Sequence, residues 1–172
     1  MNKVILIGYM GSGKSIIAKK LAIDTQIRCL ELDKLIEKKS KMAIETIFSE
    51  KGELYFRKLE HELFLEKMQS NESFVMSTGG GTPCYYNHHE LLKNENCISI
   101  YLKASITTLY DRLVLEKKNR PLISNLSNEE LKEFIAKHLF DRNFYYHQAK
   151  YTIVVDDKSV DEIVDEIIVL LT

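Results

Sequence analysis

The sequence is poor in cysteine. Its 172 residues include 3 cysteines, Cys29, Cys84 and Cys97, which is an odd number at wide spacing. This pattern argues against a disulfide framework and against a metal clip. Because Cys29 and Cys97 lie in apolar, strand-like runs, we expect them to be core thiols without chemistry of their own.

The sequence also lacks an excess of either charge and any long apolar run. Lysine and arginine number 24 against 25 aspartates and glutamates, which leaves a formal net charge of -1. A general binder of nucleic acids or membrane surfaces needs a basic excess on at least one face, so the balance argues against both classes. No stretch approaches the roughly 18 apolar residues of a membrane span, and the first residues lack the layout of a signal peptide. The sequence predicts a cytoplasmic protein.

Length and composition indicate one globular domain. Hydrophobic residues make up 45% of the chain and charged residues 28%, as in ordinary globular proteins. At about 150 residues per domain, the chain suffices for one domain and not for two. We therefore expect residues 1–172 to form a single domain.

Short apolar runs alternate along the chain with longer segments of helical periodicity. The near-continuous apolar character of most runs fits strands buried on both faces of a parallel sheet. The expected strands are 4–7, 28–32, 74–77, 98–102 and 151–155, and the expected helices are 15–22, 34–39, 43–70 with a break near Gly52, 86–93 and 105–116. Two S-x-x-E capping boxes, at Ser127 and Ser159, begin two further helices. This alternation predicts a doubly wound α/β sandwich with a central five-stranded parallel sheet.

One polar segment, residues 117–126, does not fit a packed core. It contains one of the two prolines and separates two expected helices. Its composition fits a surface loop and a mobile lid carrying Arg120 over an active site equally well.

Residues 8–15, Gly-Tyr-Met-Gly-Ser-Gly-Lys-Ser, match the pattern G-x-x-x-x-G-K-[ST] of a P-loop. The motif follows an apolar strand and opens a helix, so its backbone N–H groups and the helix N-terminus can face phosphate oxygens. Lys14 can reach the β- and γ-phosphates, and the Ser15 hydroxyl can bind Mg²⁺. The motif predicts a site for ATP or GTP, with nucleotide-binding residues Gly11, Ser12, Gly13, Lys14, Ser15 and Ile16.

Four further clusters lie at or near the ends of predicted strands, where ligands bind in open α/β sheets. Glu31 and Asp33 follow the second strand, and two residues on an extended segment face the same way. Arg57 and Glu60 are i,i+3 neighbours on a helix, so Glu60 can orient the guanidinium. The other two clusters are the run Ser-Thr-Gly-Gly-Gly over residues 77–81 and the Arg-x-x-x-Tyr motif that begins at Arg142.

Each of these clusters has a structural alternative when it is taken alone. The acidic pair after the second strand could mark a helix start, and Arg57 with Glu60 could be a solvated ion pair. Arg142 could be a plain surface residue, whereas three consecutive glycines weaken a strand and need a reason. The joint occurrence of the four clusters favours a site for the second substrate.

These motifs, taken in order, resemble those of shikimate kinases. They read G-Y-M-G-S-G-K-S, E-L-D, G-E-x-x-F-R-x-x-E, S-T-G-G-G, R-L followed by R-P-L, and R-x-x-x-Y-x-Q-A. The resemblance extends from residue 3 to about residue 155, and the combination is more specific than the P-loop alone. It implies a nucleoside-monophosphate-kinase-like P-loop NTPase fold, a three-layer αβα sandwich with a lid near 113–126 and an acceptor-binding region near 33–61. It also favours a monomer.

The resemblance implies a reaction and residues that perform it. The γ-phosphoryl of MgATP would pass to the 3-hydroxyl of shikimate, giving shikimate 3-phosphate and ADP on the route to aromatic amino acids. Asp33 would bind the reacting hydroxyl, and Arg57 with Arg142 would grip the carboxylate. Arg120 would reach the transferred phosphoryl group from the lid, and Arg112 would pack against adenine. The implied catalytic residues are Lys14, Asp33 and Arg120, and the implied substrate-binding residues are Asp33, Arg57, Gly79, Gly80, Gly81 and Arg142.

The sequence departs from the family pattern at one acidic position. Where similar proteins carry Asp-x-Asp, this chain has Glu31-Leu-Asp33. The resemblance gives the first acidic residue a water-mediated contact to Mg²⁺, so Ser15 and Glu31 are the predicted metal-site residues. Glu31 is one methylene longer than the usual aspartate, which puts the detail of the metal coordination into question.

Two other functions stay open on the sequence alone. Paired arginines can accept any small carboxylate, so a related small-molecule kinase, such as a gluconate kinase, is an alternative. A non-catalytic nucleotide-binding module would be expected to lose Lys14, Asp33 or Arg120, and all three are present. The five histidines show no metal-ligand spacing, and we expect them to be structural.

Overall fold

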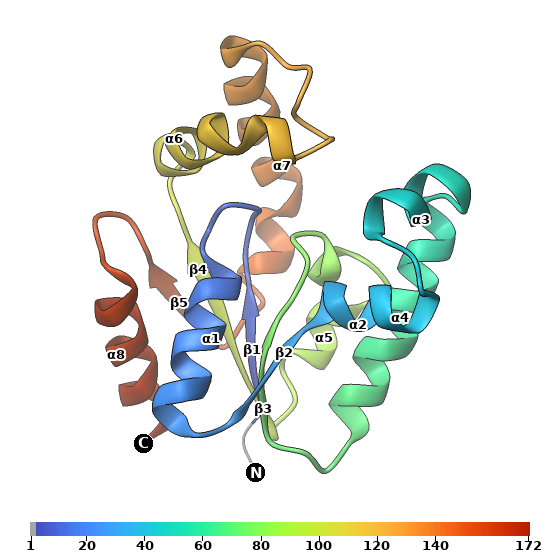
Figure 1. Ribbon diagram of the computed structural model, residues 1–172. Helices are drawn as coiled ribbons and strands as arrows, with labels where there is room; N and C mark the ends of the chain where they lie inside the picture. Colours follow the sequence, from blue (N-terminus) through green and yellow to red (C-terminus); the bar gives the residue numbers. More distant parts are fainter. Residues whose placement is uncertain (1–2) are drawn as a thin grey trace.

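A central five-stranded sheet organises the fold (Figure 1). The computed structural model describes residues 3–172, and in this part of the chain all strand pairs are parallel in the order β2-β3-β1-β4-β5. The strands are β1 Lys3–Ile7, β2 Arg28–Glu31, β3 Phe74–Ser77, β4 Cys97–Lys103 and β5 Tyr151–Val154. The predicted parallel sheet is thereby confirmed, with each strand end within one residue of its expected position.

Strand β1 lies in the middle of the sheet because its side chains are apolar and can be buried on both faces. The four residues Val4, Ile5, Leu6 and Ile7 are 0% exposed. β1 pairs with β3 on one side and with β4 on the other. Since all strands run in the same direction, their carboxyl ends meet at one edge of the sheet, where ligands bind in open α/β folds.

Helices cover both faces of the sheet. In Figure 1, α1 and α8 lie on one side and α4 and α5 on the other, while α6 and the start of α7 stand above the carboxyl ends of the strands. None of the helices in residues 3–172 is both long and apolar enough to cross a membrane. The helices are α1 Lys14–Thr25, α2 Leu32–Ser40, α3 Ile44–Glu50, α4 Glu53–Gln69, α5 His88–Leu91, α6 Ile106–Glu116, α7 Asn128–Tyr146 and α8 Val160–Leu171, with short 3₁₀ helices η1 Thr82–Cys84 and η2 Lys117–Asn119.

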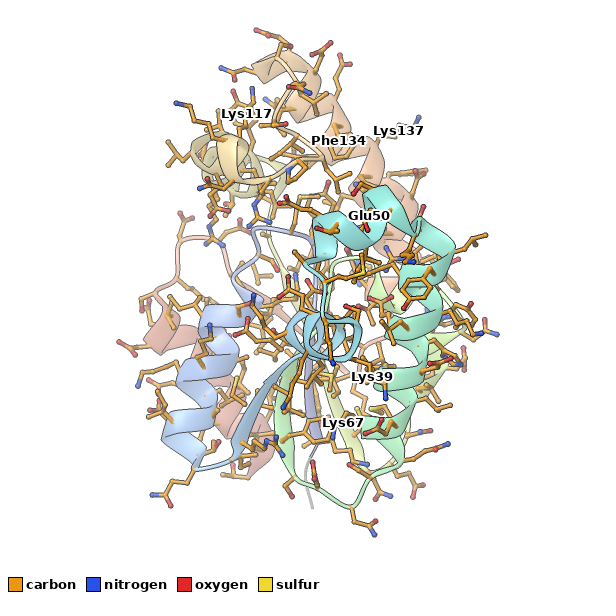
Figure 2. All side chains as sticks on the ribbon, turned by 45° about the vertical axis from the view of Figure 1, so that its right-hand side comes forward. Lys39, Glu50, Lys67, Lys117, Phe134 and Lys137 are labelled. Atoms are coloured by element: carbon orange, nitrogen blue, oxygen red, sulfur yellow. The ribbon has the colours of Figure 1, made fainter. Side chains whose placement is uncertain are left out.

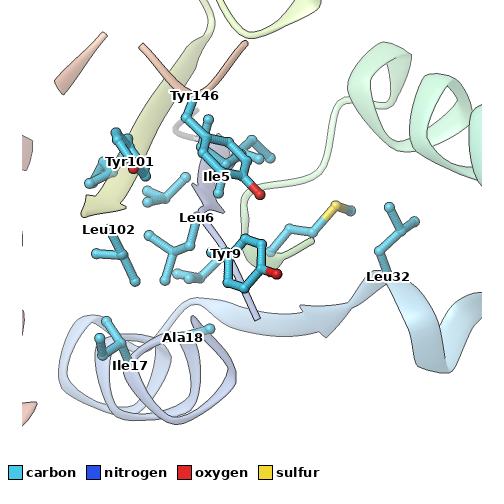
Figure 3. Packing of buried hydrophobic residues seen from close by; sticks show 14 of the residues in the cluster. Ile5, Leu6, Tyr9, Ile17, Ala18, Leu32, Tyr101, Leu102 and Tyr146 are labelled. Atoms are coloured by element: carbon cyan, nitrogen blue, oxygen red, sulfur yellow. The ribbon is translucent and has the colours of Figure 1, made fainter. Parts of the chain in front are cut away.

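The core lies between the sheet and the two helical layers (Figure 3). There, Ile17 and Ala18 of α1 approach the β1 residues from one side, and Tyr146 of α7 approaches from the other. The Tyr146 ring stacks on Tyr101 of β4 with ring centroids 5.1 Å apart. Full burial of an isoleucine or leucine side chain in this core contributes about 1.5–3 kcal/mol to stability. The packing confirms the predicted three-layer sandwich.

Two capping boxes begin helices where the sequence predicts them. The Ser127 hydroxyl accepts a hydrogen bond from the Glu130 amide, and the Glu130 carboxylate accepts one from the Ser127 amide. Ser159 and Glu162 make the same pair of bonds at the start of α8. Each box satisfies amides that lack a partner in the first helical turn.

Some expected element boundaries differ from the structure. The break near Gly52 is confirmed, because this residue has φ 84° and separates α3 from α4. The helix expected over 86–93 is shorter, since Tyr86 and Asn87 have positive φ and α5 begins only at His88. Residues 113–116, where the lid was expected to begin, form the last turn of α6, and the polar segment follows directly. We call residues 117–126 the lid.

Candidate functional site

Two adjoining cavities lie at the carboxyl edge of the sheet. The first has a volume of about 550 Å³ and is lined by the P-loop, the first residues of α1 and α8, and the second half of α6. The second, of about 380 Å³, lies between α3, the glycine run and the lid. Residues lining both cavities are Met10, Asp33, Gly79, Gly80 and Arg120. Ligands in the two cavities would therefore face each other across this shared wall.

The P-loop residues line the first cavity as the motif requires. Gly13 caps α1 with φ 96°, a backbone conformation that favours glycine and turns the loop into the helix. The Lys14 ammonium donates hydrogen bonds to the Gly8 carbonyl at 2.8 Å and to the Tyr9 carbonyl at 2.9 Å. Burial lowers the pKa of Lys14 to about 7, and the nearby Asp33 carboxylate opposes this shift. The predicted nucleotide-binding residues all line this cavity, namely Gly11, Ser12, Gly13, Lys14, Ser15, Ile16, Arg112 and Arg120.

Arg112 connects α6 to the P-loop. Its Nη1 donates a hydrogen bond to the Gly11 carbonyl at 3.0 Å. The first cavity also includes Lys158, whose ammonium lies 2.6 Å from Glu166 Oε1. Lys158 could not be predicted from the sequence, because it belongs to no motif and lines the cavity only through the packing of α8 on α1.

Arg57 and Glu60 form a buried pair in the wall of the second cavity. Arg57 is 8% exposed and Glu60 is 0% exposed, so the alternative of a solvated pair is wrong. Arg57 Nη1 lies 2.8 Å from Glu60 Oε1, and the other carboxylate oxygen of Glu60 accepts a hydrogen bond from the Thr82 hydroxyl at 2.8 Å. The guanidinium carbon of Arg57 lies 4.0 Å from the centre of the Tyr85 ring. The guanidinium is thus held in place by a carboxylate on one side and an aromatic ring on another.

The three consecutive glycines leave room for three charged side chains. A Cβ atom on Gly81 would lie 2.5 Å from Arg57 Nη2. One on Gly80 would lie 3.1 Å from Arg142 Nη1, and one on Gly79 would lie 3.4 Å from Asp33 Oδ1. The close approach of Arg57 therefore requires glycine at position 81, and that of Arg142 favours it at position 80.

Helix α7 fixes the other side of this cavity. Arg142 lines the cavity, with its guanidinium carbon 5.8 Å from the centre of the Tyr9 ring. One turn later, the buried Tyr146 donates a hydrogen bond from its hydroxyl to the Gly80 carbonyl at 2.6 Å. The Arg-x-x-x-Tyr motif therefore supplies a charged group and the bond that holds the glycine run beside it.

Glu31 and Asp33 do not lie on one extended segment, so this expectation is wrong. Strand β2 ends at Glu31, and α2 begins at Leu32, so Asp33 occupies the first helical turn. Asp33 lines both cavities, whereas Glu31 lines neither and places its Oε1 2.8 Å from the Lys19 ammonium. The helix begins one residue too early for the two carboxylates to point the same way.

The lid places Arg120 beside Glu116. Arg120 Nε and Nη2 lie 2.7 and 2.6 Å from Glu116 Oε2. Figure 2 labels Lys117, at the start of the lid, in the upper part of the molecule, and Glu50, at the end of α3, below it. Lid residues Asn119, Pro121 and Leu122 and α3 residues Ile44, Glu45 and Phe48 line the second cavity from these two sides. The second cavity thus has a wall that belongs to a loop.

The comparisons with known proteins match one family. A family model described as shikimate kinase matches residues 10–172. A shikimate kinase of Flavobacterium johnsoniae is 56% identical over 171 residues, covering 99% of each chain, and one of Flavobacterium psychrophilum is 54% identical over 167 residues, covering 97% of each. The crystal structure of shikimate kinase from Bacteroides thetaiotaomicron has a TM-score of 0.90 at 32% identity, covering 98% of this chain and 97% of that one. Shikimate kinase from Acinetobacter baumannii in complex with shikimate has a TM-score of 0.87 at 29% identity, covering 99% and 92%.

Proposed function

The chain belongs to the shikimate kinase family, and we propose that its two adjoining cavities hold ATP and shikimate for direct phosphoryl transfer. As a shikimate kinase, it transfers the γ-phosphoryl of ATP to the 3-hydroxyl of shikimate and yields shikimate 3-phosphate and ADP. The observation that supports the placement is the wall shared by the cavities, which includes Asp33 and Arg120. The gluconate kinase and the non-catalytic module are not supported by the family match.

The first cavity would bind ATP. The backbone amides of the P-loop and the N-terminus of α1 would surround the phosphates, and Lys14 would turn from its two carbonyl partners toward the β- and γ-phosphates. Arg112, fixed on the Gly11 carbonyl, would pack against the adenine. This arrangement directs the γ-phosphate toward the shared wall.

The second cavity would bind shikimate through its carboxylate and hydroxyls. Arg57 and Arg142 can form paired charge-assisted hydrogen bonds to a carboxylate, for which the planar guanidinium is well suited. The amides of Gly79, Gly80 and Gly81 would contact the ring hydroxyls. The two arginines of this cavity complement the carboxylate of a small acid, and the Asp33 carboxylate can accept a hydrogen bond from one of its hydroxyl groups.

The reaction would be carried out mainly by positioning and by charge. The 3-hydroxyl oxygen attacks the γ-phosphorus as the bond to the β,γ-bridging oxygen breaks, and the hydroxyl proton passes to the Asp33 carboxylate. Lys14 and Arg120 would stabilise the negative charge on the transferred group, the main protein contribution in phosphoryl transfer. Arg120 would exchange Glu116 for the phosphoryl oxygens as the lid closes and excludes water.

We also propose that ATP is used as its magnesium complex. The Ser15 hydroxyl lines the first cavity near Lys14 and Asp33, and the described residues contain no cluster of three acidic, histidine or cysteine ligands. This donor set fits Mg²⁺, which keeps several waters and binds through one or two protein ligands and the substrate phosphates. The ion would neutralise charge on the β- and γ-phosphates. The role of Glu31 in the metal site stays a prediction. Its carboxylate pairs with Lys19 and does not line the first cavity.

The assignment includes the setting in which the enzyme works. We propose a cytoplasmic monomer of one domain, with the acceptor region near 33–61 and a lid that opens and closes, and with no nucleic-acid or membrane partner. Free thiols at Cys29, Cys84 and Cys97 suit a reducing compartment, and burial raises the pKa of Cys84 and of Cys97 to about 11. Light scattering after size-exclusion chromatography tests the monomer.

A coupled assay of ADP release tests the function. Purified enzyme with Mg²⁺ and ATP is given shikimate, gluconate or AMP, and a reaction without acceptor measures ATP hydrolysis. We expect turnover with shikimate alone. Turnover with another acceptor and none with shikimate would overturn the assignment of the second cavity.

An Arg57→Ala variant tests the carboxylate site in the same assay. Loss of a charge-assisted contact of about 1.5–3 kcal/mol should raise the KM for shikimate about 10- to 150-fold. The KM for ATP should stay within about twofold, because Arg57 lines only the second of the two substrate cavities. Arg28→Ala is the matched control, since Arg28 is an exposed arginine of β2 that faces Glu72. An equal loss of ATP affinity in Arg57→Ala would contradict its placement.

A further inference from the structure

Two histidines lie behind the second cavity in a continuous chain of hydrogen bonds. His88 Nδ1 lies 2.8 Å from the Thr82 carbonyl oxygen, and His88 Nε2 lies 2.9 Å from His61 Nδ1. The Thr82 hydroxyl donates to Glu60, which holds Arg57. The chain therefore runs from the guanidinium beside the cavity to a half-buried histidine on α4.

The order of donors and acceptors in this chain is fixed by the Thr82 carbonyl. A carbonyl oxygen only accepts hydrogen bonds, so His88 must carry its proton on Nδ1. In a neutral imidazole the other nitrogen is then an acceptor, so His61 must donate from its own Nδ1. Both rings thus have one defined tautomer when both are neutral.

The environment of His88 favours this neutral form. Burial lowers the pKa of His88 to about 4, and the nearby His61, Arg57 and His89 add to the shift, while the bond to Thr82 opposes it. His88 is 0% exposed and its ring centre lies 4.7 Å from that of Phe64. At neutral pH the ring is therefore an uncharged donor toward Thr82.

The Thr82 hydroxyl and the Thr82 carbonyl are both hydrogen-bonded, the first to Glu60 and the second to His88. Thr82 is 1% exposed, so its carbonyl would lack a partner if His88 did not donate to it. Thr82 directly follows Gly81, at whose position a Cβ would lie 2.5 Å from Arg57 Nη2. A small shift of this turn would displace the guanidinium or open a gap beside it.

We propose that His88 and His61 are positioning residues that hold the turn after the glycine run and, through it, Arg57 in the geometry that receives the carboxylate of the acceptor. The proposal rests on the proposed role of Arg57. His88 acts on the Thr82 carbonyl, and His61 keeps the His88 ring in its donor tautomer. His61 is itself covered by Tyr86, whose ring stacks on it at a centroid distance of 4.5 Å.

Two substitutions of His88 separate its two hydrogen bonds. In His88→Asn the side-chain amide takes the place of Nδ1 and can still donate to Thr82. In His88→Gln the amide lies near the place of Nε2, so it can keep the contact with His61 and leaves the Thr82 carbonyl unpaired. His89→Asn is the control on the same helix, because His89 packs against Phe144 and Tyr145.

The test is the steady-state kinetics of these variants, with thermal unfolding measured beside it. Loss of one neutral hydrogen bond should raise the KM for shikimate about three- to tenfold in His88→Gln. In His88→Asn and His89→Asn it should stay within about twofold, and the KM for ATP should be unchanged in all three. Equal KM values for shikimate in His88→Asn and His88→Gln, or an equal rise in the KM for ATP, would overturn the proposal.

A second pair of variants tests the outer histidine if His88→Gln does not fold. His61→Asn keeps a donor at the position of Nδ1, and His61→Leu removes it from a half-buried site. We expect only His61→Leu to raise the KM for shikimate, and the same value in both variants would contradict the role of His61.

Arg57→Ala is measured in parallel. If it leaves the KM for shikimate unchanged, the proposed function fails, and if it alone raises that KM, only the inference on the histidines fails.

Discussion

Replacing Gly81 with alanine should impair shikimate binding without straining the backbone. Gly81 has φ −91° and ψ −10°, a conformation that alanine adopts readily. The new Cβ would lie 2.5 Å from Arg57 Nη2 and 3.0 Å from both Cζ and Nη1. Because ordinary carbon contacts are about 3.5–4.0 Å, the guanidinium must move by about 1 Å. The effect of Gly81→Ala is therefore an effect on Arg57.

Arg57 cannot move this far without losing its partners. It is buried, it pairs with Glu60 at 2.8 Å, and it lies against the Tyr85 ring at 4.0 Å. Misplacing one charge-assisted contact to the ligand costs about 1.5–3 kcal/mol, which corresponds to a rise of about 10- to 150-fold in the KM for shikimate. The KM for ATP should stay within about twofold, since Gly81 lines only the second of the two substrate cavities.

Gly52→Ala provides the opposite control. Gly52 has φ 84° and ψ 171°, and a Cβ there would meet no atom within 4 Å. Its substitution should cost about 1–3 kcal/mol of backbone strain, and each kcal/mol lowers the Tm by roughly 2–4 °C in a chain of this size. The kinetics of Gly52→Ala should stay normal below the unfolding temperature.

A double mutant decides whether Gly81 acts through Arg57. In an Arg57→Ala background the clash is gone, so adding Gly81→Ala should change the KM for shikimate by less than about twofold. If Gly81→Ala alone leaves this KM unchanged, or if the two effects multiply in the double mutant, the reasoning is refuted.

Three further predictions concern other parts of the molecule. Lys14→Ala should lower kcat at least about 100-fold at saturating substrates, because it removes a charge from the transferring phosphate, and near-normal kcat would exclude Lys14 from catalysis. His88 should destabilise the fold in acid: the unfolded chain takes up a proton near pH 6.5 and the folded one only near pH 4, so stability falls as pH drops between these values. Between pH 7 and 5 the free energy of unfolding, measured in urea, should fall by about 2 kcal/mol on account of His88. This loss should vanish in His88→Asn, and an unchanged dependence of unfolding free energy on pH in that variant would contradict the assignment. Glu31→Asp should shift the Mg²⁺ titration of activity modestly, and an identical titration would remove Glu31 from the metal site.

The sheet was predictable from the sequence because its strands are encoded by local patterns. The apolar run 4–7 directly before the P-loop favours a strand buried on both faces, and the two capping boxes, at Ser127 and Ser159, begin helices in the structure as predicted. The start of α2 was not predictable in this way. Leu32 is buried and begins the helix directly after β2, so tertiary packing overrode the extended conformation expected for Asp33.

The candidate site was predictable where the chemistry lies in one contiguous motif. The P-loop and the glycine run are read from neighbouring residues, and both line the cavities. The contacts that hold these motifs join distant residues, such as Tyr146 with Gly80 and His61 with His88. No local pattern carries such pairs, so the histidines were expected to be structural and their link to Arg57 was not visible.

The central place of β1 has a consequence for how the enzyme is made. Lys3 pairs with Phe74 on one side and with Cys97 on the other, so β1 is synthesised first and receives its second neighbour only after more than half of the chain. Parallel strands need long crossover connections, and closing such loops is slow compared with forming a hairpin. During translation β1 can pair with β3, but its other edge stays unpaired until β4 is made, and such an exposed apolar edge is a target for chaperones. A nascent chain that ends before β4 has the whole nucleotide motif and still lacks β4 and β5, the two strands on one side of β1.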